Sequence, residues 1–185
     1  MIKEFQGKYR FLSNFWECPV FYEGKIWPSS EHAFQAMKTL DKDEQEKIKL
    51  AENPSMAKRL GKKVTIRKDW DDIKDAIMEE IVWRKFRQNS VLRKELLRTG
   101  DEQLQEGNRW HDVEWGVDIK SGVGWNKLGQ ILMKIRDKLR TLPVCPHCKN
   151  NNGLVKFDHA ECGYTDCICV ELIGKISIDQ DNVGS

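Results

Sequence analysis

The chain has 185 residues, of which 39% are hydrophobic and 32% are charged, a composition typical of a soluble globular protein. Its formal net charge of +2 is too small to indicate nucleic acid as a partner. No apolar run approaches the roughly 20 residues that a helix needs to cross a bilayer. The first residues, Met1-Ile2-Lys3-Glu4, lack the apolar core of a signal peptide. We therefore expect a cytoplasmic protein with no membrane partner.

Composition divides the chain near residue 142. Residues 1–142 carry 28 Lys and Arg against 23 Asp and Glu, a net charge of +5, and hold all seven tryptophans. Residues 143–185 carry 3 against 6, a net charge of −3, and hold five of the six cysteines. We expect a body at 1–142 that is long enough for its own core, followed by a cysteine-rich tail at 143–185. The positive body is compatible with a phosphorylated small ligand.

The body begins with segments that are predicted to be extended. Residues 8–15 and 19–27 fit this description, and Glu23-Gly24 is predicted to form a turn between two short strands. Because a residue before proline is pushed out of the α region, Trp27-Pro28 closes the segment. A small N-terminal β-hairpin is therefore expected.

A helix is predicted directly after the hairpin and runs to about residue 40. Ser29 or Ser30 can cap its start, and Glu31 in the first turn suits the positive end of the helix dipole. At roughly 100° per residue, apolar side chains recur on one face, which we expect to be core. These residues are Ala33, Ala36, Met37 and Leu40.

The opposite face of this helix carries a polar stripe of Glu31, Gln35 and Lys38. Such a stripe is typical of a solvated helix face. It also fits the wall of a pocket that Trp27 and Phe34 would help to enclose. The spacing alone leaves both interpretations open.

Capping residues and apolar periodicity predict five further helices. They cover residues 41–51, 53–61, 69–88, 89–100 and 126–142. Residues 104–124 have few periodic apolar positions and contain four glycines, so a long ordered loop is expected there. Loops of that length in compact domains are usually functional. The predicted fold class is mainly α (α+β), with a small β portion.

Four motifs, in order, resemble the NADAR (YbiA-like) family. They are residues 9–15, Tyr-Arg-Phe-Leu-Ser-Asn-Phe; 27–38, Trp-Pro-Ser-Ser-Glu-His-Ala-Phe-Gln-Ala-Met-Lys; 108–116, Asn-Arg-Trp-His-Asp-Val-Glu-Trp-Gly; and 124–136, Gly-Trp-Asn-Lys-Leu-Gly-Gln-Ile-Leu-Met-Lys-Ile-Arg. Lys85-Phe86 and Leu104-Gln105-Glu106 extend the resemblance, which covers roughly residues 5–140. At residues 117–123 the chain departs from the glycine-rich or cysteine-containing turn that is frequent in the family.

The resemblance implies a mainly helical fold and hydrolysis of N-glycosidic bonds. Known members cleave the ribose–amine bond of phosphoribosylamino-pyrimidine intermediates of riboflavin synthesis, and others act in NAD and ADP-ribose chemistry. We therefore expect a hydrolase that acts on a small phosphorylated riboside and needs no cofactor for catalysis. The alternatives are removal of ADP-ribose from nucleic acid, which the acidic tail disfavours, and a non-catalytic module that binds ADP-ribose or NAD.

Two carboxylates are the predicted catalytic groups. Breaking a C1′–N bond leaves positive charge on the ribose ring, which a nearby carboxylate stabilises. A carboxylate can also take a proton from the attacking water. Glu31 and Asp112 are the candidates. An Asp in a loop more often caps a turn, but the resemblance favours catalysis for Asp112.

Further residues are expected to bind the substrate. Arginine and lysine hold phosphate, the first by a fork of donors and the second as a point charge. Asparagine can bond ribose or base edges, although one before a helix can instead be a cap. A tryptophan can stack on a base or fill the core, and Trp115 ranks first because a glycine follows it. The predicted set is Arg10, Ser13, Asn14, Trp27, Gln35, Lys38, Trp83, Trp110, Trp115, Gly116 and Asn126.

The tail is predicted to bind a structural zinc ion in a zinc-ribbon-like appendage. Clustered cysteines in a cytoplasmic chain indicate metal binding before disulfides. A tetrahedral zinc needs four ligands, and Cys145, Cys148, Cys162 and Cys167 can supply them. Cys169 or His159 are substitutes, and free buried cysteines are the alternative.

Overall fold

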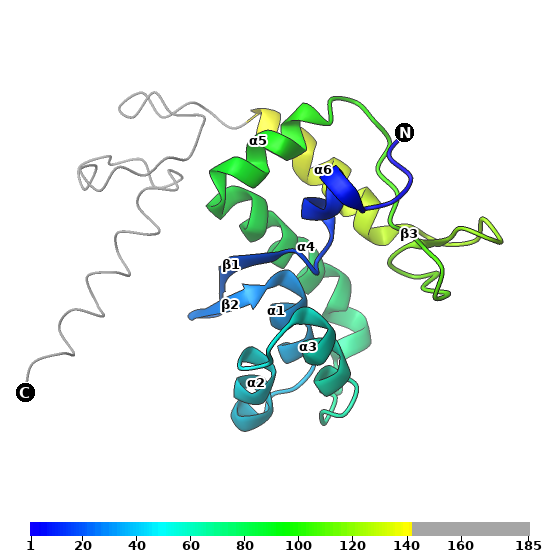
Figure 1. Ribbon diagram of the computed structural model, residues 1–185. Coiled ribbons are helices and arrows are strands. Elements are labelled where there is room, and N and C mark those ends of the chain that lie inside the picture. Colours follow the sequence, from blue (N-terminus) through cyan, green and yellow to red (C-terminus); the bar gives the residue numbers. More distant parts are fainter. Residues whose placement is uncertain (142–185) are drawn as a thin grey trace, which may run out of the picture.

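A computed structural model of the protein describes residues 1–141, which form a mainly helical body with a small antiparallel hairpin (Figure 1). This confirms the predicted fold class of that part; the predicted zinc-ribbon tail lies outside the described residues. The elements in chain order are η1 (Gly7–Leu12), β1 (Glu17–Tyr22), β2 (Lys25–Ser29), α1 (Ser30–Ala36), α2 (Lys42–Lys49), α3 (Pro54–Gly61), α4 (Trp70–Gln88), α5 (Ser90–Arg98), β3 (Gly107–Asn108), β4 (Val117–Asp118) and α6 (Lys127–Thr141).

The predicted hairpin is confirmed. Strands β1 and β2 pair antiparallel, with Val20 opposite Trp27. Glu23 and Gly24 have φ angles of 49° and 73°, the left-handed conformation that two-residue hairpin turns require. The hairpin is fixed to the end of α4 by Gln88, whose side chain exchanges two hydrogen bonds with the backbone of β1.

The expectation that residues 8–15 are extended is wrong. Gly7 adopts a φ of 55°, and the chain then makes a short 3₁₀ helix. Neighbouring residues of a strand point to opposite faces, whereas this turn lets Phe11 and Leu12 both enter the core. The ring of Phe11 meets that of Phe86 edge-on, with centroids 6.4 Å apart.

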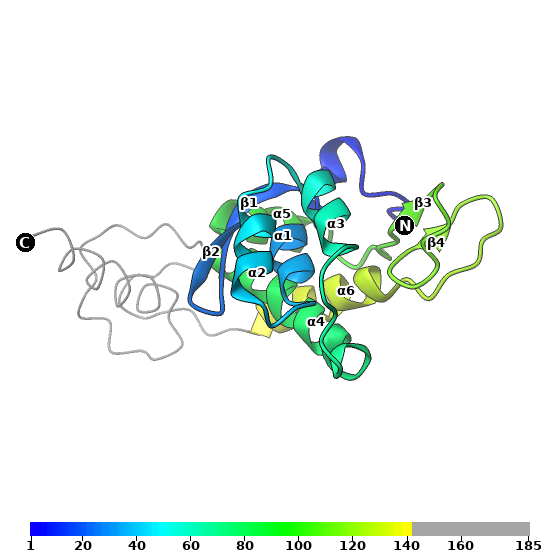
Figure 2. The same cartoon turned by 90° about the horizontal axis from the view of Figure 1, so that it is seen from below.

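Helix α1 is the centre of the body. Ser29 caps it, since its hydroxyl accepts a hydrogen bond from the His32 amide. His32 is buried and bridges Ser29 Oγ and the Ala51 carbonyl, so it anchors the helix. All seven residues of α1 are buried, and Figure 2 shows α1 among the other helices. Because the helix ends at Ala36, Leu40 lies beyond it and is 66% exposed, contrary to the predicted stripe.

The three C-terminal helices of the described part close the core from the other side. Helix α4 contacts the hairpin, α1, α5 and α6. Asn89 both follows α4 and caps α5 by accepting a hydrogen bond from the Leu92 amide. Arg136 on α6 is buried, and its guanidinium donates to Thr99 Oγ1 and to the Glu102 carbonyl. Within residues 1–141, no helix is long and apolar enough to span a membrane.

Residues 104–124 form the predicted ordered loop, which contains the short parallel pair β3 and β4. The N-terminal segment holds its first part, because Ile2 pairs with Leu104 and the Gly107 amide donates to the Lys3 carbonyl. Figures 1 and 2 both place this region beside the N-terminus at one end of the body. The loop therefore has a fixed position over the helices.

Candidate active site

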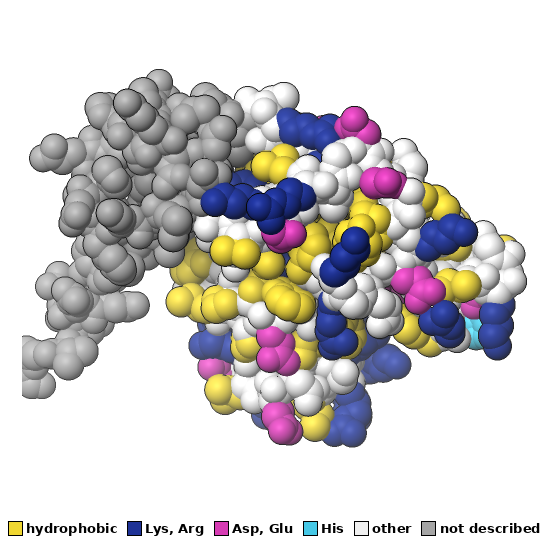
Figure 3. All heavy atoms as spheres, turned by 45° about the horizontal axis from the view of Figure 1, so that its top comes forward, with side chains coloured by type: hydrophobic (Ala, Val, Ile, Leu, Met, Phe, Trp, Pro, Cys, Tyr) yellow, Lys and Arg dark blue, Asp and Glu magenta, His cyan; other side chains and the backbone are white. Residues whose placement is uncertain are grey.

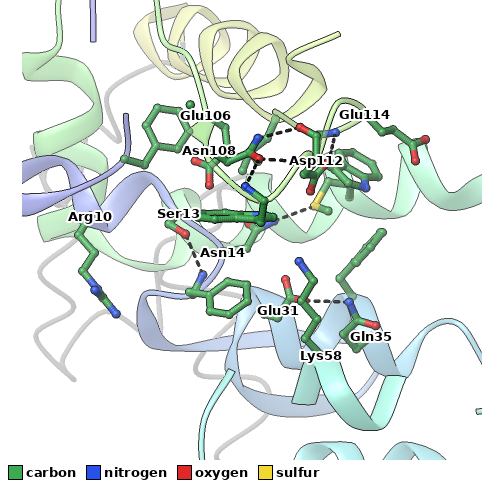
Figure 4. A pocket seen from close by; sticks show the side chains of 18 of the residues that line it. Arg10, Ser13, Asn14, Glu31, Gln35, Lys58, Glu106, Asn108, Asp112 and Glu114 are labelled. Carbon is green, nitrogen blue, oxygen red and sulfur yellow. Dashed lines mark hydrogen bonds between the residues drawn. The ribbon is translucent and has the colours of Figure 1, made fainter. Parts of the chain in front are cut away.

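A cavity of about 440 Å³ lies where this loop meets α1, α3 and α4 (Figure 4). That volume suits a small-molecule ligand. Its walls are formed by Phe5, Gln6, Arg10, Ser13, Asn14, Phe15, Glu31, Phe34, Gln35, Lys38, Lys58, Met78, Glu106, Gly107, Asn108, Trp110, Asp112, Glu114, Trp115 and Leu128. Four carboxylates, two lysines and an aromatic wall therefore surround one space.

Most of the predicted site residues line this cavity, although they come from distant parts of the sequence. Both predicted catalytic residues, Glu31 and Asp112, are among them. The other residues that the structure brings to the cavity are Arg10, Ser13, Asn14, Gln35, Lys38, Trp110 and Trp115.

Four predicted binding residues lie outside the cavity. Trp27 is fully buried in the core, where its Nε1 donates to the Tyr22 carbonyl. Trp83 belongs to the buried side of α4. Gly116 allows a close backbone approach, since a Cβ there would lie 2.2 Å from the Glu106 carbonyl oxygen. Asn126 is a structural bridge, because its amide bonds the Leu104 carbonyl and the Glu106 amide.

Glu31 stands at the start of α1 and is 5% exposed. Its amide donates to the Asn14 carbonyl, and its Oε1 accepts a hydrogen bond of 2.8 Å from Gln35 Nε2. Burial raises the pKa of Glu31, while Lys58, Gln35 and Lys38 oppose that rise. The polar stripe of α1 is therefore a buried wall of the site, and its solvated interpretation is wrong for Glu31 and Gln35.

Asp112 is half-buried and partly capped by its own loop. Its Oδ1 accepts a hydrogen bond of 2.9 Å from the Trp115 amide, the turn-capping role that is common for such an aspartate. The side chain of Asn108 accepts from the Asp112 amide and donates to its carbonyl. The capping interaction fixes the carboxylate in the cavity wall, so the two roles are compatible.

Sequence reasoning gave no role to Lys58, Glu106 and Asn108. Burial, and then the charge of Asp112, raise the pKa of Glu106 to about 7. Figure 4 shows Glu106, Asn108 and Asp112 on the loop side of the cavity, and Glu31 and Lys58 on the opposite side. Glu106 and Asn108 lie within the segments that resemble the NADAR family, and this resemblance could have identified them as site residues. Lys58 had none.

Aromatic side chains form one wall of the cavity. The rings of Phe34 and Trp115 meet edge-on with centroids 5.4 Å apart, and Phe34 also contacts Trp70. Lys127 Nζ lies 5.6 Å from the centroid of the Trp115 ring. Trp110 is 59% exposed. A flat ligand can therefore meet a fixed surface at Trp115 and an open one at Trp110.

The cations differ in burial. Arg10 is exposed and lies apart from the carboxylates in Figure 4. Lys38 is partly buried, and burial lowers its pKa although Glu31 opposes the shift. No group of three or more His, Cys, Asp or Glu side chains within residues 1–141 is arranged to hold a metal ion. The predicted zinc ligands Cys145, Cys148, Cys162 and Cys167 lie outside the described residues.

The fold and the site define a mainly helical protein with a carboxylate-lined small-molecule cavity. The family model described as NADAR domain matches residues 2–140. The chain belongs to the NADAR family, as its motifs indicated.

Named relatives agree with this assignment. The chain is 39% identical over 133 residues to N-glycosidase YbiA of Escherichia coli (strain K12), a match that covers 71% of this chain and 82% of that protein. It is 44% identical over 132 residues to riboflavin biosynthesis protein VVA0006 of Vibrio vulnificus (strain YJ016), which covers 70% of this chain but only 35% of that protein. The NMR structure of E. coli YbiA matches with a TM-score of 0.68 and 36% identity, over 76% of this chain and 85% of that one.

Proposed function

We propose that the protein is a cytoplasmic N-glycosidase that hydrolyses the C1′–N bond of a phosphoribosylamino-pyrimidine or a closely related phosphorylated riboside. The names of the relatives support the reaction class and the link to riboflavin intermediates. The observation that carries the proposal is the convergence of Glu31 and Asp112, from a helix start and a distant loop, on one cavity.

The buried position of Glu31 suits it to stabilise the reacting sugar. As the C1′–N bond breaks, positive charge develops on the ribose ring, and a carboxylate at its face lowers the barrier. Burial strengthens that interaction because less water screens it. The hydrogen bond from Gln35 holds the carboxylate in place, so no reorganisation is needed at the moment of reaction.

Asp112 is suited to activate the attacking water. One of its oxygens is used by the Trp115 amide, which leaves the other free to accept a proton. Because the capping hydrogen bond fixes the side chain, that oxygen has a defined position in the wall. Asp112 and Glu31 line the same cavity, where the sugar would lie.

The other residues of the cavity wall are suited to bind the substrate. Trp115, held edge-on by Phe34, offers a surface for the pyrimidine ring. Asn14 is buried, and its Oδ1 has no hydrogen-bond partner among the described residues, so it can accept from a ribose hydroxyl. Lys38 and Lys58 supply positive charge for the phosphate.

A small ligand is favoured over nucleic acid by the size of the cavity and by the charge distribution on the surface. On the face in Figure 3, Lys and Arg side chains are interspersed with acidic, apolar and neutral ones instead of forming one continuous basic patch. Nucleic-acid binding depends on clustered cations that neutralise phosphates. This observation concerns that face of residues 1–141.

The proposal is tested by a substrate panel scored for the sugar-containing product that hydrolysis releases from each compound. It contains a phosphoribosylamino-pyrimidine, NAD, ADP-ribose and ADP-ribosylated DNA, each with the wild type and with Glu31→Gln. We expect the first to be cleaved, and we expect Glu31→Gln to lower turnover by about a hundredfold or more at nearly unchanged affinity. Tight ligand binding with no sugar released from any compound would instead identify a binding module.

A further inference from the structure

Glu106 is a further carboxylate in the cavity wall, and the roles proposed for Glu31 and Asp112 do not use it. Its backbone is fixed on both sides. The amide donates to Asn126 Oδ1 over 3.0 Å, and the carbonyl accepts from the Val117 amide over 2.9 Å. The side chain therefore leaves a rigid segment directly before β3 and points to the cavity (Figure 4).

The hydrogen bonds of Glu31, Asp112 and Glu106 separate their roles. Glu114, the fourth carboxylate of the wall, is paired with Lys74 and Lys127. Glu31 Oε1 accepts from Gln35, and Asp112 Oδ1 accepts from the Trp115 amide. Glu106 Oε2 is buried and has no hydrogen-bond partner within residues 1–141. A buried carboxyl oxygen with no donor is stable when it carries a proton, and costly when it carries charge.

The charges around Glu106 favour the same state. Burial is the largest cause of the raised pKa of Glu106, and the negative charges of Asp112 on the loop and Glu31 on α1 raise it further. Lys85 on α4 and Lys58 on α3 oppose them. Lys85 is fully buried, but its ammonium donates to the Ser13 carbonyl over 2.7 Å and not to Glu106. The net result is that the pKa of Glu106 rises to about 7.

We propose that Glu106 is the general acid that gives a proton to the leaving nitrogen, an inference that rests on the N-glycosidase function proposed above. The C1′–N bond breaks with its electron pair on nitrogen, and nitrogen takes the proton of the Glu106 carboxyl group. The oxygen of water bonds to C1′ and releases its proton to Asp112. Transfer of that proton back to Glu106 through water restores the starting state, with no other reactant.

This assignment gives Glu31, Asp112 and Glu106 one task each. A leaving amine needs a proton because it would otherwise depart as an unstable anion. The group that supplies the proton must be protonated near neutral pH, and carboxyl groups in apolar surroundings are raised into that range. Glu31 and Asp112 would act as carboxylates at the sugar and at the water.

The test compares two substrates that differ only in the leaving group. One is the phosphoribosylamino-pyrimidine, and the other carries a nitro group on the same ring, which makes the departing nitrogen a better leaving group. Glu106→Gln should lower turnover of the first by about a hundredfold or more, the scale of general acid catalysis, and of the second by less than tenfold. The matched control is Glu95→Gln, which changes a half-exposed glutamate on α5 that pairs with Arg98 and should alter neither rate.

The pH profile of the unmodified enzyme gives a second measurement that does not depend on the variant. Turnover of the first substrate should fall as the pH rises above about 7, because Glu106 then loses its proton. The nitro substrate should show a weaker decline. If Glu106→Gln fails to fold, as its melting curve would show, this profile decides the question.

Different failures have different meanings. Equal losses on both substrates, or no loss on either, would overturn the role of Glu106 while leaving the N-glycosidase function intact. A wild-type profile with no decline above pH 7 would do the same. If the wild type cleaves neither riboside, the proposed function fails and this inference fails with it.

Discussion

The unusual ionisation of Glu106 has a consequence for stability that needs no substrate. Its pKa is about 7 in the folded protein against an ordinary value of 4.5. At about 1.4 kcal/mol per pH unit, this difference corresponds to roughly 3 kcal/mol in the free energy of unfolding. A glutamine at this position keeps the shape of the side chain but cannot ionise.

The direction in which stability changes with pH follows from how many protons the folded and unfolded chains bind. Below pH 4.5 the carboxyl group is protonated in both the folded and the unfolded chain, so its ionisation has no effect. Between pH 4.5 and about 7 only the unfolded chain releases the proton, and the wild type therefore loses stability as the pH rises. Above pH 7 the full loss of roughly 3 kcal/mol persists. The free energy of unfolding of Glu106→Gln, relative to that of the wild type, should therefore increase by roughly 3 kcal/mol between pH 4 and pH 8.

Urea unfolding, followed by tryptophan fluorescence at pH 4, 6 and 8, measures this difference directly. The complete chain is used for both proteins, so contributions shared by wild type and variant cancel. Glu95→Gln, measured in parallel, corrects for the general effect of removing one negative charge. If the stability difference between wild type and Glu106→Gln is the same at all three pH values, Glu106 ionises like an exposed glutamate. The general-acid role would then lose its physical basis.

Three further predictions concern other parts of the chain. Gly61→Ala should lower turnover, because the Cβ of the new alanine would lie 2.1 Å from Gln35 Oε1 and displace Gln35, which donates to Glu31. Normal steady-state kinetics of this variant would contradict the prediction. Trp115→Ala should weaken binding of a pyrimidine riboside by about 1–3 kcal/mol in calorimetry, whereas unfolding of the variant would show a core role. Freshly purified protein should contain about one zinc per chain in metal analysis, and replacing Cys145 and Cys148 with Ser should release it. Absence of zinc from unchelated wild type would refute that prediction.

The features that the sequence predicted well are those that local chemistry determines. Ser29 and Asn89 cap the helices that follow them, because their side chains accept hydrogen bonds from first-turn amides wherever the helix lies in the fold. The turn at Glu23-Gly24 likewise needs only two residues that tolerate a left-handed backbone. These signals do not depend on tertiary contacts.

The features that were missed depend on how distant elements meet. A tryptophan can fill a core or stack on a ligand with the same sequence spacing, so Trp27 and Trp83 stayed in the predicted binding set although Trp115 ranked first. Lys58 reaches the cavity because α3 lies close to α1, and Gly61 permits that approach by having no Cβ to strike Gln35. The pattern on α3 alone contains no trace of this arrangement.

Under the proposed function, the buried ionisable groups connect stability with activity in this fold. Burial raises the pKa of Glu31 and Glu106 and lowers that of Lys85 to about 8, so each group is held away from its preferred solvated state. Glu31 and Glu106 line the cavity, and Lys85 donates to the carbonyl of Ser13, which is another residue of its wall. A medium that disfavours charge also leaves it unscreened, so under the proposed function a sugar that becomes cationic there would interact with the Glu31 carboxylate more strongly than it would in water. Under that proposal, the free energy that the folded protein loses by burying Glu31 and Glu106 makes possible the roles that both residues are given at the riboside.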